Sequence, residues 1–437
     1  MTDRIDPKRQ FRATRRTFLK QAATAAALMA AARELLPYGA YAAPAVPEVT
    51  GAKLGFIALT DSAPLIIAKE KGLYEKYGVP DVEVLKQASW GATRDNMALG
   101  GENGGIDGGH ILRPKVHLYS SGAVMQNKQK LPMYTLVNLN EDCQAISVAQ
   151  EYADTNVQLD AGALKEAFAK KKASGKAATV AVTFPGGTHD LWMRYWLAAG
   201  GIDPNADVEV IVVPPPQMVA NMKVGNMDAF CVGEPWNEQL VHQKIGFTAA
   251  TTGELWFRHP EKVLGMRASF VDANPKATLA IMMAVMEAQQ WCDKMENKHE
   301  MAEIVGKRQW YNVPVADIIG RIKGDINYGN GRTAAGTNLL MKFWGEKGET
   351  SYPWKSLDSW FVAENIRWGK FPGTTDIKAM VDATNRSDLW LEAAKGLGLA
   401  DMPSGDSRGV ETFFDGKTFD PANPSAYLDS LAIKAMV

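Results

Sequence analysis

The feature that most constrains the fold is a strand–turn–helix order that occurs twice in series. Residues 52–78, AKLGFIALTDSAPLIIAKEKGLYEKYG, are typical of a short apolar strand, a turn in which Asp61 or Ser62 can cap a helix, and a helix with Pro64 in its first turn. Residues 178–201, ATVAVTFPGGTHDLWMRYWLAAGG, begin a second unit with a strand, a Gly-rich turn and a helix. Strands that alternate with helices predict α/β architecture, with parallel or mixed sheets covered by helices.

The size and charge of the chain limit what it can bind. Its 437 residues are enough for two domains with separate cores. The first 42 residues hold eight basic and three acidic side chains, which leaves 40 basic and 46 acidic residues in the rest. A mildly acidic body argues against nucleic acid as a partner. Any anion must therefore be bound by a local site and not by the overall field.

The first 42 residues have the composition of a targeting segment. TRRTFLK, residues 14–20, resembles the twin-arginine export signal, and an Ala-rich apolar stretch and the small residues AYA at 40–42 follow it. The apolar stretch is too short to span a bilayer. We predict that residues 1–42 are a twin-arginine signal peptide and that the product is periplasmic without a lipid anchor. The alternative is an amphipathic N-terminal helix of a cytoplasmic protein.

The residues that usually carry catalysis or metal binding do not form motifs here. Cys143, Cys231 and Cys292 are far apart and odd in number, so their spacing supports neither a disulfide framework nor a CxxC site. His110 and His117 are too loosely spaced for a metal pair. No P-loop, GxSxG or paired-carboxylate helix is evident. We therefore expect no enzyme, no metal and no cofactor.

The last third of the chain is predicted to be helical. Residues 275–295, PKATLAIMMAVMEAQQWCDKM, combine strong helix formers with an apolar face. Six of the twelve tryptophans occur from Trp310 onward. We expect these aromatic side chains to serve packing and not a binding site.

Seven stretches together resemble the nitrate- and bicarbonate-binding periplasmic proteins of ABC importers: GFIALTDSAPLIIAKEKGL, KQASWGATRDN, GIDGGHIL, QAISVA, FPGGTHDLWMRYWLAAGGIDP, VGEPWN and HPEK with GMRASF. The resemblance runs from about Lys53 to the end. It implies an α/β, two-lobed periplasmic binding protein of the second structural type, with a helical C-terminal extension packed on lobe one. Lobe one would be 51–145 with 262–437, and lobe two 146–261. Such a monomer would close on a small anion like a hinge and deliver it to ABC importer membrane subunits.

The same resemblance implies an anion site whose residue types suit nitrate, a flat monoanion with three acceptor oxygens. Trp90 offers a planar face and an N–H donor, and the turn after it offers backbone N–H groups. Taken singly, each side chain also has a structural explanation, as a core aromatic, an exposed amide, a helix cap or a solvated charge. The predicted nitrate-binding residues are Trp90, Gly91, Ala92, Thr93, Gln144, His189 and Lys262.

Lys262 separates the two anions that the family resemblance allows. In the bicarbonate branch the matching position looks acidic and is helped by a calcium ion, whereas a lysine supplies positive charge and repels a metal. Glu261 precedes Lys262, and on a strand the two would point to opposite sides. Lys262 in the pocket predicts nitrate or nitrite, and a slip of one residue would restore bicarbonate with calcium. A taurine- or sulfonate-type binding protein and a cytoplasmic nitrate sensor remain as alternatives.

Overall fold

The first of two five-stranded sheets is assembled from strands that lie far apart in the chain. The computed structural model describes residues 46–335 and 339–435, so the predicted signal peptide lies outside it. β1 pairs in parallel with two strands, and β10 runs antiparallel between its two neighbours. In order of pairing, the strands are β2 (Glu83–Lys86), β1 (Lys53–Phe56), β3 (Gly108–Leu112), β10 (Lys262–Arg267) and β4 (Met133–Asn138).

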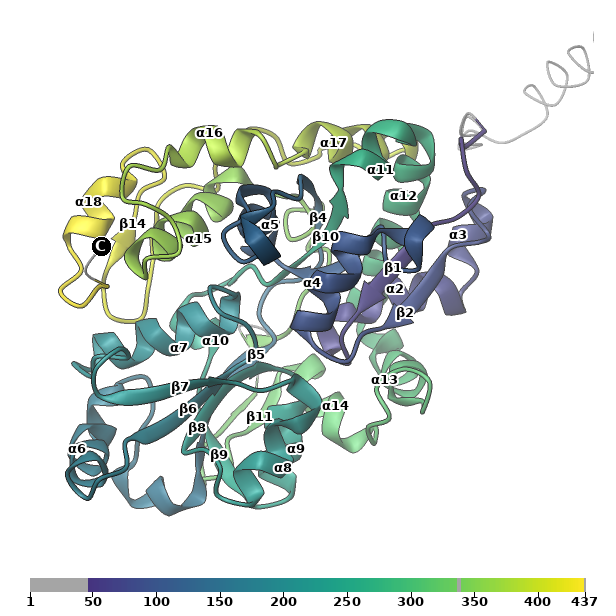
Figure 1. Ribbon diagram of the computed structural model, residues 1–437. Coiled ribbons are helices and arrows are strands. Elements are labelled where there is room, and N and C mark those ends of the chain that lie inside the picture. Colours follow the sequence, from purple (N-terminus) through teal and green to yellow (C-terminus); the bar gives the residue numbers. More distant parts are fainter. Residues whose placement is uncertain (1–45, 336–338, 436–437) are drawn as a thin grey trace, which may run out of the picture. The chain divides into compact units, whose positions relative to one another are not determined.

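The second sheet repeats this plan (Figure 1). β6 pairs in parallel with β7 and β8, and β5 runs antiparallel between β8 and β9. In each sheet the fourth strand is the one that enters from the other sheet, because β5 follows β4 and β10 follows β9. In order of pairing, the strands are β7 (Val208–Val212), β6 (Ala178–Val182), β8 (Ala229–Gly233), β5 (Gln144–Ala149) and β9 (Gly246–Thr251).

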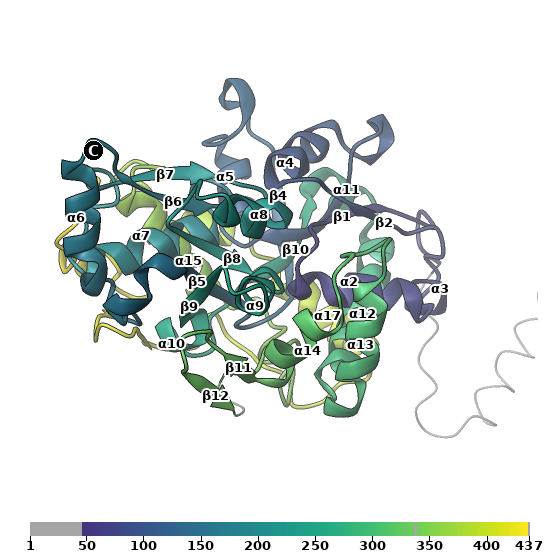
Figure 2. The same cartoon turned by 90° about the horizontal axis from the view of Figure 1, so that it is seen from below.

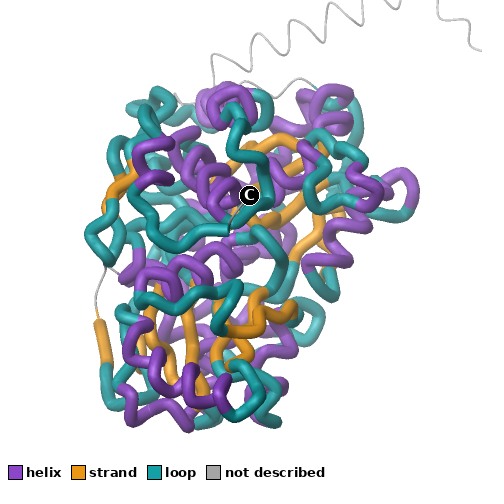
Figure 3. Tube along the Cα trace, turned by 60° about the vertical axis from the view of Figure 1, so that its left-hand side comes forward, coloured by secondary structure: helices purple, strands orange, loops and turns teal. Residues whose placement is uncertain are grey.

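Helices cover the sheets, which confirms the predicted α/β architecture (Figure 3). No helix in the described part of the chain is long and apolar enough to cross a membrane. The α-helices are α2 (Ala63–Glu70), α3 (Leu73–Lys76), α4 (Trp90–Leu99), α5 (Lys115–Ser121), α6 (Lys165–Ala173), α7 (Thr188–Ala199), α8 (Met218–Lys223), α9 (Trp236–His242), α10 (Thr252–Leu255), α11 (Ala268–Ala273), α12 (Pro275–Asp293), α13 (Lys298–Gly306), α14 (Ala316–Lys323), α15 (Lys355–Arg367), α16 (Ile377–Asp382), α17 (Ser387–Gly396) and α18 (Pro424–Asp429).

Two segments carry the chain between the sheets, residues 139–143 and 252–261. They meet in an antiparallel bridge between Glu141 and Pro260. β10 of the first sheet begins at Lys262, the predicted start of the return to lobe one. β5 of the second sheet begins at Gln144, just inside the predicted bounds of lobe one. A strand residue at the end of a crossing can point into the space between the sheets, so this placement suits a ligand-binding residue.

The residues after β10 do not pack on the first sheet alone. α12 lies along α2, as expected, and the two helices are neighbours in Figure 2. α14, however, packs on α9 of the second sheet, where Arg321 Nε lies 2.6 Å from Glu238 Oε2. The hairpin of β11 (Asp325–Asn327) and β12 (Thr333–Ala335) follows it, and Thr248 N donates to Tyr328 O at 2.8 Å. The buried carboxylates of Glu234 and Glu238 require a cation, and Arg321 of α14 supplies it, so α14 packs on the second sheet.

The C-terminal aromatic side chains are part of the core, as predicted. Trp310, Trp344, Trp360, Trp368 and Trp390 are buried. The ring of Trp360 stacks on Trp192 of α7 with a centroid distance of 5.1 Å. A small hairpin of β13 (Glu411–Thr412) and β14 (Thr418–Phe419) lies close to this cluster through Phe413. The extension therefore contacts the second sheet's helices as well as the first sheet.

Candidate functional site

Trp90 is the first residue of α4, so the predicted strand-to-helix turn is a helix N-terminus. Ser89 precedes it as N-cap, and its hydroxyl accepts from Ala92 N at 3.0 Å. Thr93 N donates to Ser89 O at 2.9 Å. The predicted backbone donors of Ala92 and Thr93 are thus already used within the protein. The N–H groups of Trp90 and Gly91 are the first-turn donors that helix geometry leaves for a ligand.

The Trp90 side chain is wholly buried, yet its indole N–H has no hydrogen-bond partner among the described residues. Its ring lies 5.4 Å from the His110 ring, measured between centroids. A buried unpaired donor costs about 1–3 kcal/mol. Such a group is unusual in a folded protein and points to a missing acceptor.

Gln144 and His189 show the same property. Both side chains are buried, and neither polar atom of the Gln144 amide has a partner in the described chain. The His189 ring contacts the Thr183 hydroxyl at 2.6 Å through Nδ1, while Nε2 is unpartnered. If the Thr183 hydroxyl donates, Nε2 carries the proton and is a free donor. Trp90 and Gln144 therefore offer N–H groups that lack acceptors, and His189 adds a third when Nε2 carries the ring proton.

These residues come from both sheets to one place. Gln144 pairs with Gly233 in β8, and a Cβ at Gly233 would lie 3.5 Å from Asp61 Oδ2. Asp61 in turn contacts His110, the neighbour of the Trp90 ring. His189 lies close enough to Lys262 and Asp61 for their charges to affect its pKa.

Lys262 does not stand alone as a free charge. Its Nζ donates to Asp61 Oδ2 and to Glu261 Oε2, each at 2.8 Å, and all three side chains are wholly buried. Burial alone would lower the pKa of Lys262, but the two carboxylates outweigh burial and raise that pKa. Burial would raise the pKa of Asp61, but Lys262 and His110 hold it well below its usual range. The lysine is charged, and its charge is neutralised by neighbours.

Two sequence expectations are wrong here. Strand alternation does not separate Glu261 from Lys262, because Glu261 precedes the first residue of β10 and its carboxylate turns back to the Lys262 ammonium. Asp61 does not cap α2, and Ser62 makes no side-chain cap either. Instead the Asp61 carboxylate also contacts His110 Nε2 at 2.6 Å. Asp61 and His110 are site residues that the sequence did not mark as such.

The buried chain of polar groups continues into the second crossing. Glu261 Oε1 lies 3.0 Å from His259 Nδ1, although the two are not aligned as a hydrogen bond. Trp192 Nε1 donates to His259 Nε2. Burial lowers the pKa of His259, of His110 and, to well below its usual value, of His189. With these rings neutral, Asp61, Glu261 and Lys262 sum to one negative charge.

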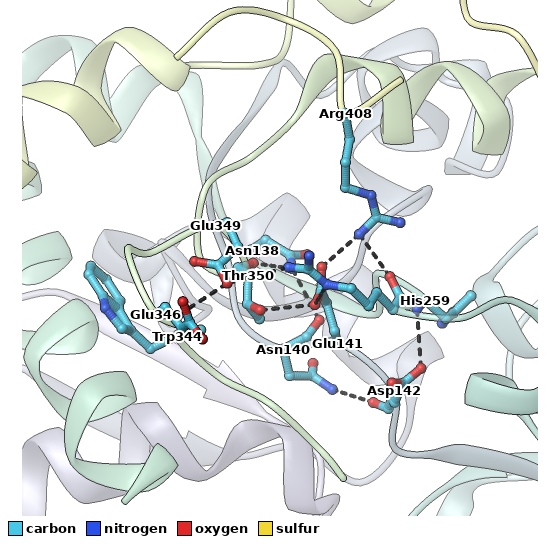
Figure 4. A network of polar contacts seen from close by, with 12 residues as sticks. Asn138, Asn140, Glu141, Asp142, His259, Trp344, Glu346, Glu349, Thr350 and Arg408 are labelled. Carbon is cyan, nitrogen blue, oxygen red and sulfur yellow. Dashed lines mark hydrogen bonds and ion pairs between the residues drawn. The ribbon is translucent and has the colours of Figure 1, made fainter. Parts of the chain in front are cut away.

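A polar network holds the two crossings in place (Figure 4). Arg408 Nη1 donates to Glu141 Oε1 at 2.7 Å, and His259 N donates to Asp142 Oδ1 at 3.1 Å. Thr350 Oγ1 donates to Glu141 Oε2 at 2.9 Å. Gln144 and Lys262 begin their strands directly beyond these anchored residues, so their backbones are positioned precisely for ligand contact.

Hydrogen bonds also join the first-sheet and second-sheet sides near the site. Thr60 N donates to Glu234 O at 2.8 Å, and Trp236 Nε1 donates to Ala58 O at 3.0 Å. In the turn before α7, Gly186 N donates to Asp190 Oδ2 at 2.7 Å, so one of the turn donors is satisfied internally. The site therefore combines hydrogen bonds between its two sides with buried polar atoms that have no partner among the described residues. It can hold a small, dehydrated anion.

Comparison with known proteins identifies the group to which the chain belongs. The NMT1-like family matches residues 45–306. The chain is a member of the NMT1-like family. Among relatives, the nitrate/nitrite binding protein NrtA of Synechocystis sp. is 60% identical over 393 residues, which cover 89% of this chain and 86% of that protein. The crystal structure of the periplasmic nitrate-binding protein NrtA from Synechocystis PCC 6803 superposes with a TM-score of 0.86 at 59% identity, covering 89% of this chain and 100% of that one.

Two further relatives show lower identity to this chain. The bicarbonate-binding protein CmpA of Synechococcus elongatus is 44% identical over 396 residues, or 89% of this chain and 88% of that protein. The nitrate import ATP-binding protein NrtC of Synechocystis sp. is 34% identical over 381 residues, or 87% of this chain and 55% of that protein. The similarity to NrtA confirms two predictions, that the fold is a two-lobed binding-protein fold and that the chain is a binding protein and not an enzyme.

Proposed function

We propose that this protein captures nitrate, with nitrite as a second ligand, between its two sheets and delivers it to an ABC permease. The observation that carries the proposal is the set of buried side-chain polar atoms without partners on Trp90, Gln144 and His189. A planar anion that accepts from all three would remove the cost of leaving them unpaired. The greater identity to a nitrate/nitrite binding protein than to a bicarbonate-binding protein supports the same ligand.

In this proposal Trp90 donates from the edge of its ring, and the first-turn N–H groups of α4 near Gly91 add donors. Ala92 and Thr93 shape that turn, with Ser89 holding it. Gln144 and His189 complete the donor set from the second sheet. Lys262 orders the surrounding carboxylates and keeps a metal away, so calcium is not required.

We also propose that the chain is exported by the twin-arginine route, works in the periplasm as a monomer, and hands its ligand to ABC importer membrane subunits. The superposed NrtA of Synechocystis PCC 6803, which supports this proposal, is a periplasmic nitrate-binding protein. The nitrate import ATP-binding relative supports a partner of the ABC type.

Calorimetry on the chain from residue 43 onward tests the ligand. Nitrate and nitrite should give saturable heats in buffer with EDTA. Bicarbonate, with or without added calcium, and taurine should give none. Tight binding of bicarbonate that depends on calcium, with no response to nitrate, would replace the proposal by its main alternative.

A further inference from the structure

The helix α15 is attached to the first sheet and also contacts a helix of the second. Asp358, near its start, accepts from Arg113 Nε at 2.7 Å, and both side chains are wholly buried. Arg113 directly follows β3 of the first sheet. α15 also contacts α7, which packs on β6 and β8 of the second sheet (Figure 1). One element of the C-terminal extension therefore spans from one sheet to the other.

Asn365 of α15 contacts Gly186, in the turn that precedes α7. The Asn365 side chain is wholly buried, and its Nδ2 donates to Gly186 O at 3.1 Å. A Cβ on Gly186 would lie 2.5 Å from Asn365 Oδ1, and the φ of Gly186 is +72°. The close contact and the backbone conformation both exclude a side chain at this position. The glycine therefore gives the turn the shape that fits against Asn365.

The same turn leads directly to His189, the proposed ligand donor of α7. His189 is the second residue of that helix, and Gly186 N donates to Asp190 Oδ2 at 2.7 Å, which ties the turn to the start of the helix. Three positions after His189, the ring of Trp192 stacks on Trp360 of α15 with a centroid distance of 5.1 Å and an interplanar angle of 25°. α15 therefore contacts the chain both before and after His189.

These contacts depend on how close the two sheets are. The proposed site lies between Trp90 of α4 and His189 of α7. A rotation that moves His189 away from Trp90 also moves α7 away from α15, because α15 is attached to the first sheet. Gly186 O would then bond to water, and Trp192 would lose its stacking partner. The contacts of α15 with α7 are therefore complete only in the closed state, in which both sheets can contact the ligand.

We propose that α15 is a latch for the closed state, and that Asn365 and Trp360 are positioning residues that hold His189 through its turn and its helix. The latch contacts no part of the ligand. It favours the closed state, so it raises the apparent affinity and slows release. This inference rests on the proposed nitrate site and deepens it, because it gives the C-terminal extension a part in retaining nitrate.

The test uses Asn365→Ala in the chain from residue 43 onward. The change removes the donor to Gly186 O, which then lacks this partner in the closed state but is hydrated in the open state. The loss of one neutral hydrogen bond is worth about 5-fold in an equilibrium constant. We expect nitrate affinity to be about 5-fold lower by calorimetry and release to be about 5-fold faster by stopped flow, with little change in the association rate.

Asn385 provides a matched control. Its side chain is also buried, and its Nδ2 donates to Pro353 O at 2.6 Å and to Asp358 Oδ2 at 2.8 Å, both within the C-terminal extension. Asn385→Ala should lower the melting temperature equally with and without nitrate, and should leave nitrate affinity and release unchanged. A purely structural role of Asn365 would give the same result, whereas the latch predicts that Asn365→Ala reduces the stabilisation by a fixed nitrate concentration.

Trp360→Phe tests the latch at its other contact. The smaller ring weakens the stack on Trp192, so release should be about 2- to 10-fold faster. A wild-type release rate in Asn365→Ala, or an equal change in the Asn385→Ala control, overturns the latch while nitrate binding itself stands. If Asn365→Ala does not fold, a wild-type release rate in Trp360→Phe overturns it equally. Absence of any nitrate heat in wild type refutes the proposed function instead.

Discussion

Replacing Lys262 by methionine tests whether this lysine is above all a neutralising residue. The change keeps the volume of the side chain but removes the ammonium from its two contacts of 2.8 Å with Asp61 and Glu261. Both carboxylates would then be wholly buried without their cation. Breaking a buried ion pair from one side costs about 3–5 kcal/mol of the free energy of unfolding.

That cost converts into a measurable shift in melting temperature. With an unfolding entropy of about 2.1 cal/mol/K per residue, a folded chain of about 390 residues changes its stability by about 0.8 kcal/mol per degree near the midpoint. Lys262→Met should therefore melt about 4–6 °C lower at pH 7.5 if the chain unfolds as one unit. Differential scanning calorimetry and urea unfolding should agree on the loss.

The pH dependence gives the sign of the effect. In wild type the pKa of Asp61 is held low, so its contribution to stability is present above the unfolded pKa and is lost only in strong acid. Without Lys262, burial dominates and the pKa of Asp61 rises. As pH falls from about 7.5 to about 5, protonation of Asp61 removes an unpaired buried charge from the variant. The difference in free energy of unfolding between the variant and wild type therefore becomes smaller.

A second substitution makes the test decisive. In Asp61→Asn/Lys262→Met one of the two orphaned carboxylates is gone, so about half of the lost stability should return. The neutralising role of Lys262 is refuted if the double variant is no more stable than Lys262→Met. It is also refuted if Lys262→Met has the same melting temperature as wild type.

Three shorter predictions follow from other contacts of the site. Trp90→Phe removes the unpartnered indole N–H but keeps a ring, so nitrate affinity should fall about 10-fold by calorimetry, and the cavity left by the smaller buried ring should also lower the melting temperature. Burial raises the pKa of Glu234 from 4.5 to about 7, so this group favours the folded state when protonated, and wild-type stability to urea should decline as pH rises from 4.5 to about 7 and level off above it. Glu234→Gln should make stability less dependent on pH, and an unchanged dependence would contradict the raised pKa of Glu234. Trp236→Phe removes the donor to Ala58 O across the site, so stopped-flow release of nitrate should become about 5-fold faster, whereas an unchanged rate would show that this bond does not hold the site closed.

Much of the fold could be predicted from the sequence because the patterns that indicate strands, turns and helices are local. The strands around 53–56 and 178–182, the helix with Pro64 in its first turn, and the packing role of the late tryptophans were all predictable from apolar runs, turn residues and composition. The four site side chains, by contrast, were placed by resemblance, since any of them alone suits the core or the surface.

The parts that could not be predicted depend on charges that meet only in three dimensions. Asp61 and Lys262 are 201 positions apart, and nothing in TDSAP distinguishes a buried ion-pair partner from a helix cap. Arg321 pairs with Glu238, 83 positions away, and so draws α14 onto the second sheet.

The strand order of the first sheet has a consequence for how the chain is made. β10 fills the position between β3 and β4 but is synthesised after every strand of the second sheet, and Arg321 comes later still. The first sheet therefore cannot be completed until every strand of the second sheet has been synthesised. The second lobe in turn lacks the cation that pairs with Glu238 until Arg321 has been synthesised. Folding must therefore be completed after nearly the whole chain is available, since Arg408 also anchors Glu141 of the first crossing.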